Sequence, residues 1–344
     1  MHATYRSDWR AGITVLNYQY VRLWHGLLFF IILTTVGLLG CGATHPPYDT
    51  TEALKTFEID PGFTVELFAH EPNVVDPVAM VFDEYGRIYV VESPGYPLET
   101  GERLGRVKLL EDTDEDGLPD RATLFADKLT LPTGVMRWKN GILVTDAPNI
   151  WYFEDTDRDG RADVRRVVLT GFAFTNPQHT VNSPLYGLDN WIYLAHRRSV
   201  EARVFSEKFG DHGTAIHFPD RDDLPSTNPE GRYLRFRPDS YELELLSGSS
   251  QFGHTFDAWG RHFGVLNPIP GRHEVIAARY LERNPDLAVS EVMQDLSEDR
   301  HVAFITEQPE SPRKNWGFFD SFGHLTSACS ITCYLGGAFG EKYH

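Results

Sequence analysis

The chain has little cysteine and little positive charge, and each shortage excludes a class of protein. Its 344 residues include only 3 cysteines, too few for a fold built on disulfide bonds. Lysine and arginine total 32 against 49 aspartate and glutamate residues, which gives a formal net charge of −17. Phosphate backbones would repel so acidic a chain, so we expect no nucleic-acid partner. The sequence also lacks nucleotide-binding glycine motifs and the G-x-S-x-G motif, so those chemistries have no support.

Apolar and turn-forming residues, by contrast, are abundant. Hydrophobic residues make up 41% of the chain and aromatic residues 13%, enough to bury a large core. The 29 glycines and 21 prolines separate short aromatic runs, a pattern typical of short strands joined by turns. We therefore predict an all-β fold.

An apolar run of 18 residues, Leu23–Gly40, lies near the start of the chain and follows several arginines. This order of a positive flank, an apolar run and small residues is typical of an export signal. The run ends in Leu-Leu-Gly-Cys, which resembles the lipobox of bacterial lipoproteins, so Cys41 is the predicted lipidation site. A plain membrane anchor is the alternative, since the run is also long enough to span a bilayer. Both interpretations place the rest of the chain in the cell envelope, exported and attached to a membrane.

Four later segments share one pattern, in which a turn with Gly or Asn is followed by an alternating apolar strand. Aligned on the turn residue, successive segments lie 55, 49 and 70 residues apart. Repeats of about fifty residues with several short strands are typical of β-propeller blades. The segments begin at Met80, Val135, Leu185 and His254, and a partial fifth unit follows Trp316. We predict a flexible tether over residues 42–55 and a β-propeller over 56–344 whose last blade or blades are missing.

Two acidic loops, residues 112–120 and 155–163, both read D-x-D-x-D-G-x-x-D and lie 43 residues apart. Oxygen ligands at alternate positions, with glycine for a sharp turn, suit Ca²⁺. The twelfth position, where an EF-hand has glutamate, holds Thr123 or Arg166, so we predict short calcium hairpins with a structural role. A solvated turn without an ion is the alternative. The predicted ligands are Asp112, Asp114, Asp116, Asp120, Asp155, Asp157, Asp159 and Asp163.

Histidines recur near the predicted blade strands. His179 precedes the strand of the third segment, His254 lies at the matching point of the fourth, and His324 at that of the partial fifth. Residues just before an inner strand face the channel of a propeller, where His179 would act as a general base near neutral pH. A hydrogen-bonded structural histidine is the alternative for His179, and a transition-metal site is a further one for the three together.

Three residues are the candidates for binding a cofactor: Asn182, Arg197 and His254. Asn182 lies in the segment that precedes the strand of the third repeat. Arg197 and its neighbour Arg198 follow that strand, where they either supply positive charge to an anionic ligand or pair with surface carboxylates.

A family resemblance rests on the spacing H-x7-G-x-D-x2-I-Y, which begins here at His179 and ends at Tyr193. It is similar to the segment that bears the catalytic histidine in soluble quinoprotein glucose and sorbosone dehydrogenases. The region from Phe57 onward resembles more closely the N-terminal propeller of a family of bacterial membrane-bound dehydrogenases. The phrases that carry this resemblance are PGFTVELFA, DPVAMVFDEYGRIYVVES, NSPLYGLDNWIYLAH, FGHTFDAWGRHFGVLN and LTSACS.

The resemblance implies a six-bladed propeller that uses pyrroloquinoline quinone (PQQ) with Ca²⁺ and oxidises a small sugar or alcohol. His179 would take the hydroxyl proton while hydride passes to the quinone, and a c-type cytochrome would accept the electrons. The chain departs from the quinoprotein pattern at Ser249-Ser250, where those proteins have Arg-Asn, and at Asn182-Ser183-Pro184, where they have Gly-Arg-Leu. A non-catalytic, calcium-stabilised propeller that binds a glycan or a protein is therefore the alternative function.

Overall fold

The computed structural model describes residues 48–174, 176–197, 213–229, 231–284, 286–287, 289, 291–297 and 328–340. The chain divides into two compact units, Met1–Leu67 and Phe68–His344. In the first unit, helix α2 (Thr50–Leu54) begins after Asp49, whose carboxylate accepts a hydrogen bond of 2.8 Å from the Glu52 amide. The end of the segment predicted to be a flexible tether is therefore helical, because Asp49 caps a run of helix-forming residues. The division also falls later than residue 55.

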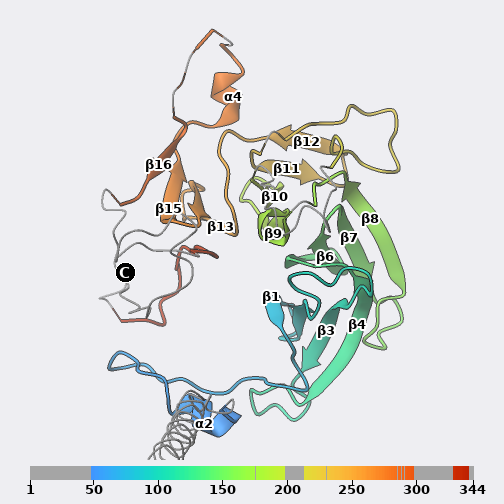
Figure 1. Ribbon diagram of the computed structural model, residues 1–344, viewed down its shortest axis with the longest axis vertical. Coiled ribbons are helices and arrows are strands. Elements are labelled where there is room, and N and C mark those ends of the chain that lie inside the picture. The colour runs from blue at the N-terminus through green and yellow to red at the C-terminus, as the bar shows by residue number, and fades with distance from the viewer. Residues whose placement is uncertain are drawn as a thin grey trace, which may run out of the picture. The chain divides into compact units, whose positions relative to one another are not determined.

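The described part of the second unit contains four antiparallel sheets of four strands each, which follow one another along the chain (Figure 1). We call them blades 1 to 4. Blade 1 contains β1 (Pro77–Phe82), β2 (Ile88–Glu92), β3 (Gly105–Glu111) and β4 (Arg121–Leu129), and blade 2 contains β5 (Gly134–Trp138), β6 (Gly141–Asp146), β7 (Asn149–Glu154) and β8 (Val164–Thr170). Blade 3 contains β9 (Asn182–Tyr186), β10 (Ile192–Ala195), β11 (Leu234–Arg237) and β12 (Glu242–Leu245), and blade 4 contains β13 (His254–Phe256), β14 (His262–Leu266), β15 (Ile269–Glu274) and β16 (Met293–Asp295).

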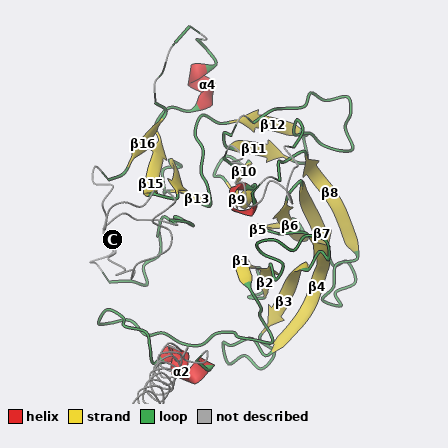
Figure 2. Cartoon of the chain, viewed as in Figure 1, coloured by secondary structure: helices red, strands yellow, loops and turns green. Residues whose placement is uncertain are grey.

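Within each blade, consecutive strands are hydrogen-bonded neighbours, so successive meanders form a β-propeller. The all-β prediction is confirmed, and each of the four repeat segments contains the first hairpin of a blade. The described helices of this unit are short: the 3₁₀ turn η1 (Pro177–His179) and α4 (Ala278–Leu281), which Figure 2 shows among strands and loops. The six-bladed prediction stays a prediction, and most of the partial fifth unit lies outside the described residues.

Apolar side chains fill the space between neighbouring blades. Strand β6 is buried on both faces, which explains its continuous apolar sequence. Ile142 and Val144 on one face pack with Leu109 of blade 1, while Leu143 on the other packs with Leu194 of blade 3. Burying each such side chain contributes about 1.5–3 kcal/mol, so the contacts between blades account for much of the stability of this unit.

The first strands of the blades run in the same direction. Where they begin, Thr133 donates a hydrogen bond of 2.6 Å to the Val181 carbonyl, and the Asn182 amide donates one of 2.9 Å to the Gln251 carbonyl. Where they end, a 3.0 Å ion pair joins Arg137 to Glu84. The unit thus has an entry end, where chain segments enter the first strands, and a turn end, which carries the hairpin turns between first and second strands.

Within the described residues, no helix has the length and hydropathy needed to cross a bilayer. The apolar run Leu23–Gly40 and the predicted lipidation site Cys41 lie outside those residues.

Candidate functional site

A pocket of about 300 Å³ lies at the entry end of the first strands. Segments from all four blades line it, since Tyr96 follows β2, Thr133 precedes β5, Gln178 precedes β9 and Gln251 precedes β13. The other lining residues are Val78, Ser93, Leu131, Pro132, Pro177, Phe252, Asn267, Ala328 and Cys329. Blade repetition therefore brings distant parts of the sequence to one cavity.

The lining of this pocket is uncharged. None of its described residues is an aspartate, glutamate, lysine, arginine or histidine, although the chain carries a net charge of −17. Its polar groups are amides and hydroxyls, and its remaining walls are apolar. Such a cavity favours a neutral ligand, because a charge placed in it would lose its hydration without gaining an ionic partner.

Hydrogen bonds between blades fix the polar groups of the pocket. The Gln178 amide donates to the Tyr96 hydroxyl at 2.8 Å, so a side chain from η1 is held by one from blade 1. Gln251 Oε1 accepts from Arg197 at 2.9 Å and from the Asn267 backbone amide at 3.3 Å. Because its oxygen is occupied in this way, Gln251 presents its Nε2 group as a donor.

A buried carboxylate shapes the pocket wall at blade 2. Asp146 accepts hydrogen bonds from the backbone amides of Thr130 and Leu131, at 3.0 and 2.9 Å. Burial raises the pKa of Asp146, although these two amides act in the opposite direction. The contact holds the segment that delivers Leu131 and Thr133 to the pocket.

His179, the predicted general base, lies in η1 directly after Gln178. Its Nδ1 atom is buried without a hydrogen-bond partner in the described residues. Burial and the nearby Arg197 charge lower the pKa of His179 to about 4, so its imidazole is neutral at pH 7. The residue is adjacent to the pocket but is not one of its lining residues. Its catalytic role stays a prediction.

Asn182 and Arg197 join pocket segments to one another. The buried Asn182 amide donates to the carbonyls of Thr180 and Gln251, and its oxygen accepts from the Gly253 amide, each at 2.9 Å. Through these three hydrogen bonds the Asn182 side chain connects blades 3 and 4. Among the described residues, Arg197 contacts the pocket by donating a hydrogen bond to Gln251 Oε1. Its neighbour Arg198 lies outside the described residues.

His254 lies at a different place from the one expected. It is the first residue of β13, is buried, and has both ring nitrogens in hydrogen bonds, 2.7 Å to the Ser183 carbonyl and 2.8 Å to His262. It therefore packs between blades 3 and 4 and does not match the position of His179. His262 in turn contacts Glu274 at 2.9 Å, and Glu274 accepts from the Ser247 hydroxyl at 2.6 Å. His324, the third predicted histidine, lies outside the described residues.

The positions of the protons in this run of hydrogen bonds follow from the groups that His254 and Glu274 contact. The Ser183 carbonyl only accepts, so His254 carries a proton on Nε2, and one further proton lies in each of the contacts His254–His262 and His262–Glu274. Burial lowers the pKa of His254 to about 3, so His254 is neutral and accepts from His262. Burial raises the pKa of Glu274, but hydrogen bonds from His262 and Ser247 outweigh it and hold that pKa below its usual value. The contacts thus form one continuous run of hydrogen bonds, from the Ser183 carbonyl through His254 and His262 to the Glu274 carboxylate and the Ser247 hydroxyl.

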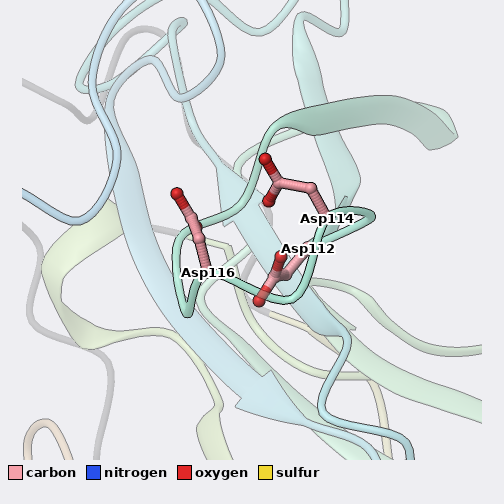
Figure 3. A group of neighbouring side chains, drawn as sticks. All are labelled: Asp112, Asp114 and Asp116. Atoms are coloured by element: carbon pink, nitrogen blue, oxygen red, sulfur yellow. The ribbon is translucent and has the colours of Figure 1, made fainter.

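The two acidic loops form the turns between β3 and β4 and between β7 and β8. In each loop, the aspartates at positions 1, 3 and 5 offer one carboxylate oxygen each, and these three oxygens lie within 4.8 Å of one another. Figure 3 shows the three side chains of the first loop. The clustered residues are Asp112, Asp114 and Asp116 in one loop and Asp155, Asp157 and Asp159 in the other. Three converging carboxylates fit the donor set of a hard cation.

The fourth predicted ligand of each loop has a different partner. Asp120 accepts from the backbone amide and hydroxyl of Thr113, at 2.9 and 2.6 Å, and Asp163 accepts from the same groups of Thr156. These bonds lower the pKa of both carboxyls. Asp120 and Asp163 therefore close the base of each loop and lie outside the clusters of three.

The predicted cofactor PQQ is an anionic quinone and needs cationic partners. None of the described pocket residues supplies a cation, and the nearby Arg197 is hydrogen-bonded to Gln251. The described lining residues by themselves therefore do not supply the cationic partners that PQQ needs, although Arg197, which keeps its charge when bonded to the neutral Gln251, lies beside them. Sequence reasoning also missed Tyr96 and Gln251. The signal was present for Gln251, since it precedes a first strand as Gln178 does, and that is the position expected to face the channel.

The fold and the pocket together define a β-propeller with a cavity at the entry end of its blades whose described lining is uncharged. The family model for a domain of unknown function, DUF7133, matches residues 49–344, so the chain belongs to that family. No curated protein matches the chain.

Several solved structures are similar at low identity. The luciferin-regenerating enzyme shares 8% identity at a TM-score of 0.35, with 62% of this chain and 63% of that chain covered. The PQQ domain of pyranose dehydrogenase from Coprinopsis cinerea shares 16% at 0.39, with 72% and 52% covered. The PQQ-bound aldose sugar dehydrogenase from Streptomyces coelicolor shares 14% at 0.35, with 59% and 60% covered. The chain thus spans less than two thirds of the length of each.

Proposed function

We propose that the entry-end pocket binds a small, neutral, polyhydroxylated molecule of monosaccharide size. The observation that carries this proposal is the uncharged lining, which combines amides and hydroxyls with apolar walls. Its volume of about 300 Å³ lies at the lower end of the range for ligand pockets. The Tyr96 hydroxyl and the side-chain amides of Gln178 and Gln251 would pair with sugar hydroxyls, while Val78 and Phe252 would contact the C–H faces of the ring.

Isothermal titration of the full chain with three sugars of equal size tests this function. We expect D-glucose to bind more tightly than D-glucuronate or D-glucosamine, because the described lining residues carry no charge. Tyr96→Phe should weaken glucose binding about two- to tenfold, the range for one lost hydrogen bond. Tyr186→Phe is the matched control, since Tyr186 is exposed to a similar degree, 47% against 48%, and lies at the other end of a first strand. Equal binding of all three sugars, or equal loss in both variants, would overturn the proposal.

The second function, oxidation of the bound sugar as the sequence resemblance implies, has one observation in its favour. The unpartnered Nδ1 of His179 belongs to a neutral imidazole next to Gln178, which is the form a general base requires. We assign no step to PQQ, because the described pocket lacks cations for it. A titration with PQQ in calcium and in EGTA, followed by tryptophan fluorescence, separates the two functions. Saturable, calcium-dependent quenching would favour the dehydrogenase.

For the acidic loops we propose Ca²⁺ binding with a structural role. The support is the convergence of three carboxylates in each loop, at the same turn of two consecutive blades. A cation there would relieve the repulsion among these carboxylates and tie the third and fourth strands of each blade together.

A further inference from the structure

The turn end of the propeller carries the three most exposed large apolar side chains in the described part of the chain. Tyr85, Leu188 and Trp259 are 76%, 77% and 79% exposed. Each lies in the turn between the first and second strands of its blade, in blades 1, 3 and 4. Their recurrence at one turn of the repeat is a feature of a surface, because exposed apolar residues of a monomer are otherwise scattered singly.

The turns of blades 1 and 4 are held by the same set of internal contacts. Asp83 accepts from the backbone amides of Tyr85 and Arg87, both at 2.9 Å, and pairs with the Arg87 guanidinium at 2.7 Å. Asp257 makes the same contacts in blade 4, with the amides of Trp259 and Arg261 and with the Arg261 guanidinium. Backbone amides and charged side chains therefore hold the turns of blades 1 and 4, while the apolar side chain of each extends into solvent.

The turns of neighbouring blades contact one another or an adjacent strand. A 3.0 Å ion pair links Glu84 in the turn of blade 1 to Arg137 at the end of β5. At blades 3 and 4, the Leu188 side chain lies so close to Gly260 that a Cβ there would sit 3.7 Å from it. The exposed apolar residues thus belong to one rim, which we call the turn rim.

Charge on the turn rim is close to balanced, unlike that of the chain as a whole, since its ion pairs join four arginines to five carboxylates. Its arginines pair with neighbouring carboxylates: Arg87 with Asp83, Arg261 with Asp257, Arg137 with Glu84, and Arg235 with Asp189 and Glu244. The guanidinium groups of Arg87 and Arg261 also lie over the rings of Tyr85 and Trp259, at 5.7 and 4.8 Å. Such a rim neither repels a surface of zwitterionic lipids nor depends on anionic lipid for attraction.

We propose that the turn rim docks on the surface of a zwitterionic lipid bilayer, with Tyr85, Leu188 and Trp259 inserted at the headgroup level. Tyrosine and tryptophan with flanking arginines are the residues that favour this interface. Only 27 residues separate Gly40, the end of the apolar run, from Phe68, the start of the propeller unit. That length spans at most about 100 Å, so a propeller attached through the run or Cys41 stays close to the membrane.

This orientation has a consequence for the pocket. The turn rim lies at the ends of the first strands and the pocket at their beginnings, so a docked propeller presents the pocket away from the lipid. A small polar ligand would then reach the cavity directly from the aqueous side. The docking does not depend on what the pocket binds, so its test is separate from that of the proposed function.

The test uses the full chain in phosphatidylcholine vesicles, prepared with ordinary or brominated acyl chains. Bromine quenches tryptophans that enter the bilayer, and the difference between the wild type and Trp259→Phe isolates the signal of Trp259. We expect that signal to be quenched at low and at high salt alike, because the rim charges are paired internally. Trp151→Phe is the control, since Trp151 lies in β7 and not on the turn rim.

A double variant tests whether the rim acts as one surface. Tyr85→Ser with Leu188→Ser should lower the docked-to-free ratio, read from the quenching of Trp259, by about tenfold or more, because it removes two apolar insertions. Tyr280→Ser with Leu287→Ser is the matched control, as both residues are 52% exposed but lie outside the rim. A chain that does not associate with the vesicles, an unquenched Trp259, or equal losses in the two double variants would each overturn the proposal.

Discussion

Glu274 tests whether a buried hydrogen-bond chain holds blades 3 and 4 together. Its carboxylate contacts His262 at 2.9 Å and accepts from the Ser247 hydroxyl and amide at 2.6 and 3.3 Å. Glu274→Leu would remove this partner from the buried His262 and from the half-buried Ser247, whose hydroxyl also contacts the Ile276 carbonyl. Removing one member of a buried pair typically costs about 3–5 kcal/mol. Glu274→Leu should therefore destabilise the protein by that amount.

Glu274→Gln should behave differently, because a glutamine can occupy the same positions with every hydrogen bond retained. Its Oε1 would accept from Ser247, and its Nε2–H would donate to His262, which in turn donates to His254. Only the charge assistance is lost, a change of about 1 kcal/mol. The two variants thus separate the hydrogen-bond chain from the charge.

Thermal and urea unfolding of the full chain measure these effects. For a domain of this size, each 1 kcal/mol shifts Tm by about 2–4 °C, so we expect a decrease of about 10 °C for the leucine variant and about 3 °C for the glutamine variant. Glu282→Gln, on the exposed residue after α4, should leave Tm unchanged. Equal decreases in Tm for the leucine and glutamine variants would refute the proton assignment. An unchanged Tm in both would show that these hydrogen bonds do not hold blades 3 and 4 together.

Three further predictions concern pH, packing and calcium. Between pH 7.5 and 5.5 the free energy of unfolding should fall by about 1.4 kcal/mol for each of the buried, neutral His196 and His254 per pH unit below about 6.5, because the unfolded chain binds protons there that the folded chain does not. Urea titrations would detect this, and constant stability would contradict lowered pKa values for these two histidines. Gly264→Ala should destabilise the protein by about 1–3 kcal/mol or more, because a Cβ there would lie 1.7 Å from the hydroxyl of the buried Tyr233. Gly337→Ala is the control, since nothing lies within 4 Å of a Cβ at that position, and it should leave the urea midpoint unchanged. Calcium should raise the Tm of the wild type relative to EGTA. Asp114→Asn should raise Tm in EGTA, since it removes one of three repelling carboxylates, and should reduce the increase in Tm caused by calcium. An increase of the same size in the variant and the wild type would contradict calcium binding in that loop.

The sequence was informative wherever a signal is local. Alternating apolar residues around a turn glycine or asparagine predicted the first hairpin of each blade, and the structure has β1–β2, β5–β6, β9–β10 and β13–β14 in those places. The acidic motifs were predicted to lie between strands, and both form the turn between the third and fourth strands of a blade. These features depend on residues within about fifteen positions of one another, so the pattern itself carries them.

The helix α2 was missed for a related reason. Polar residues and prolines just before it suggested a tether, but the side chain of Asp49 caps the turn that follows. A single capping contact can decide such a short segment, and composition does not reveal it.

The sequence by itself determined an all-β chain of repeated units of several short strands with two acidic hairpin turns, because strand alternation and turn chemistry are encoded locally. Only the tertiary structure decided which polar residues are available to a ligand. Asn182 and His254 looked like site residues, yet the contact between blades 3 and 4 uses all the hydrogen-bonding groups of their side chains. Gln178 and Gln251, 73 positions apart, meet at one pocket because the first strands of successive blades start at the same end. A sequence lists donors and acceptors, but packing between blades determines which of them remain free.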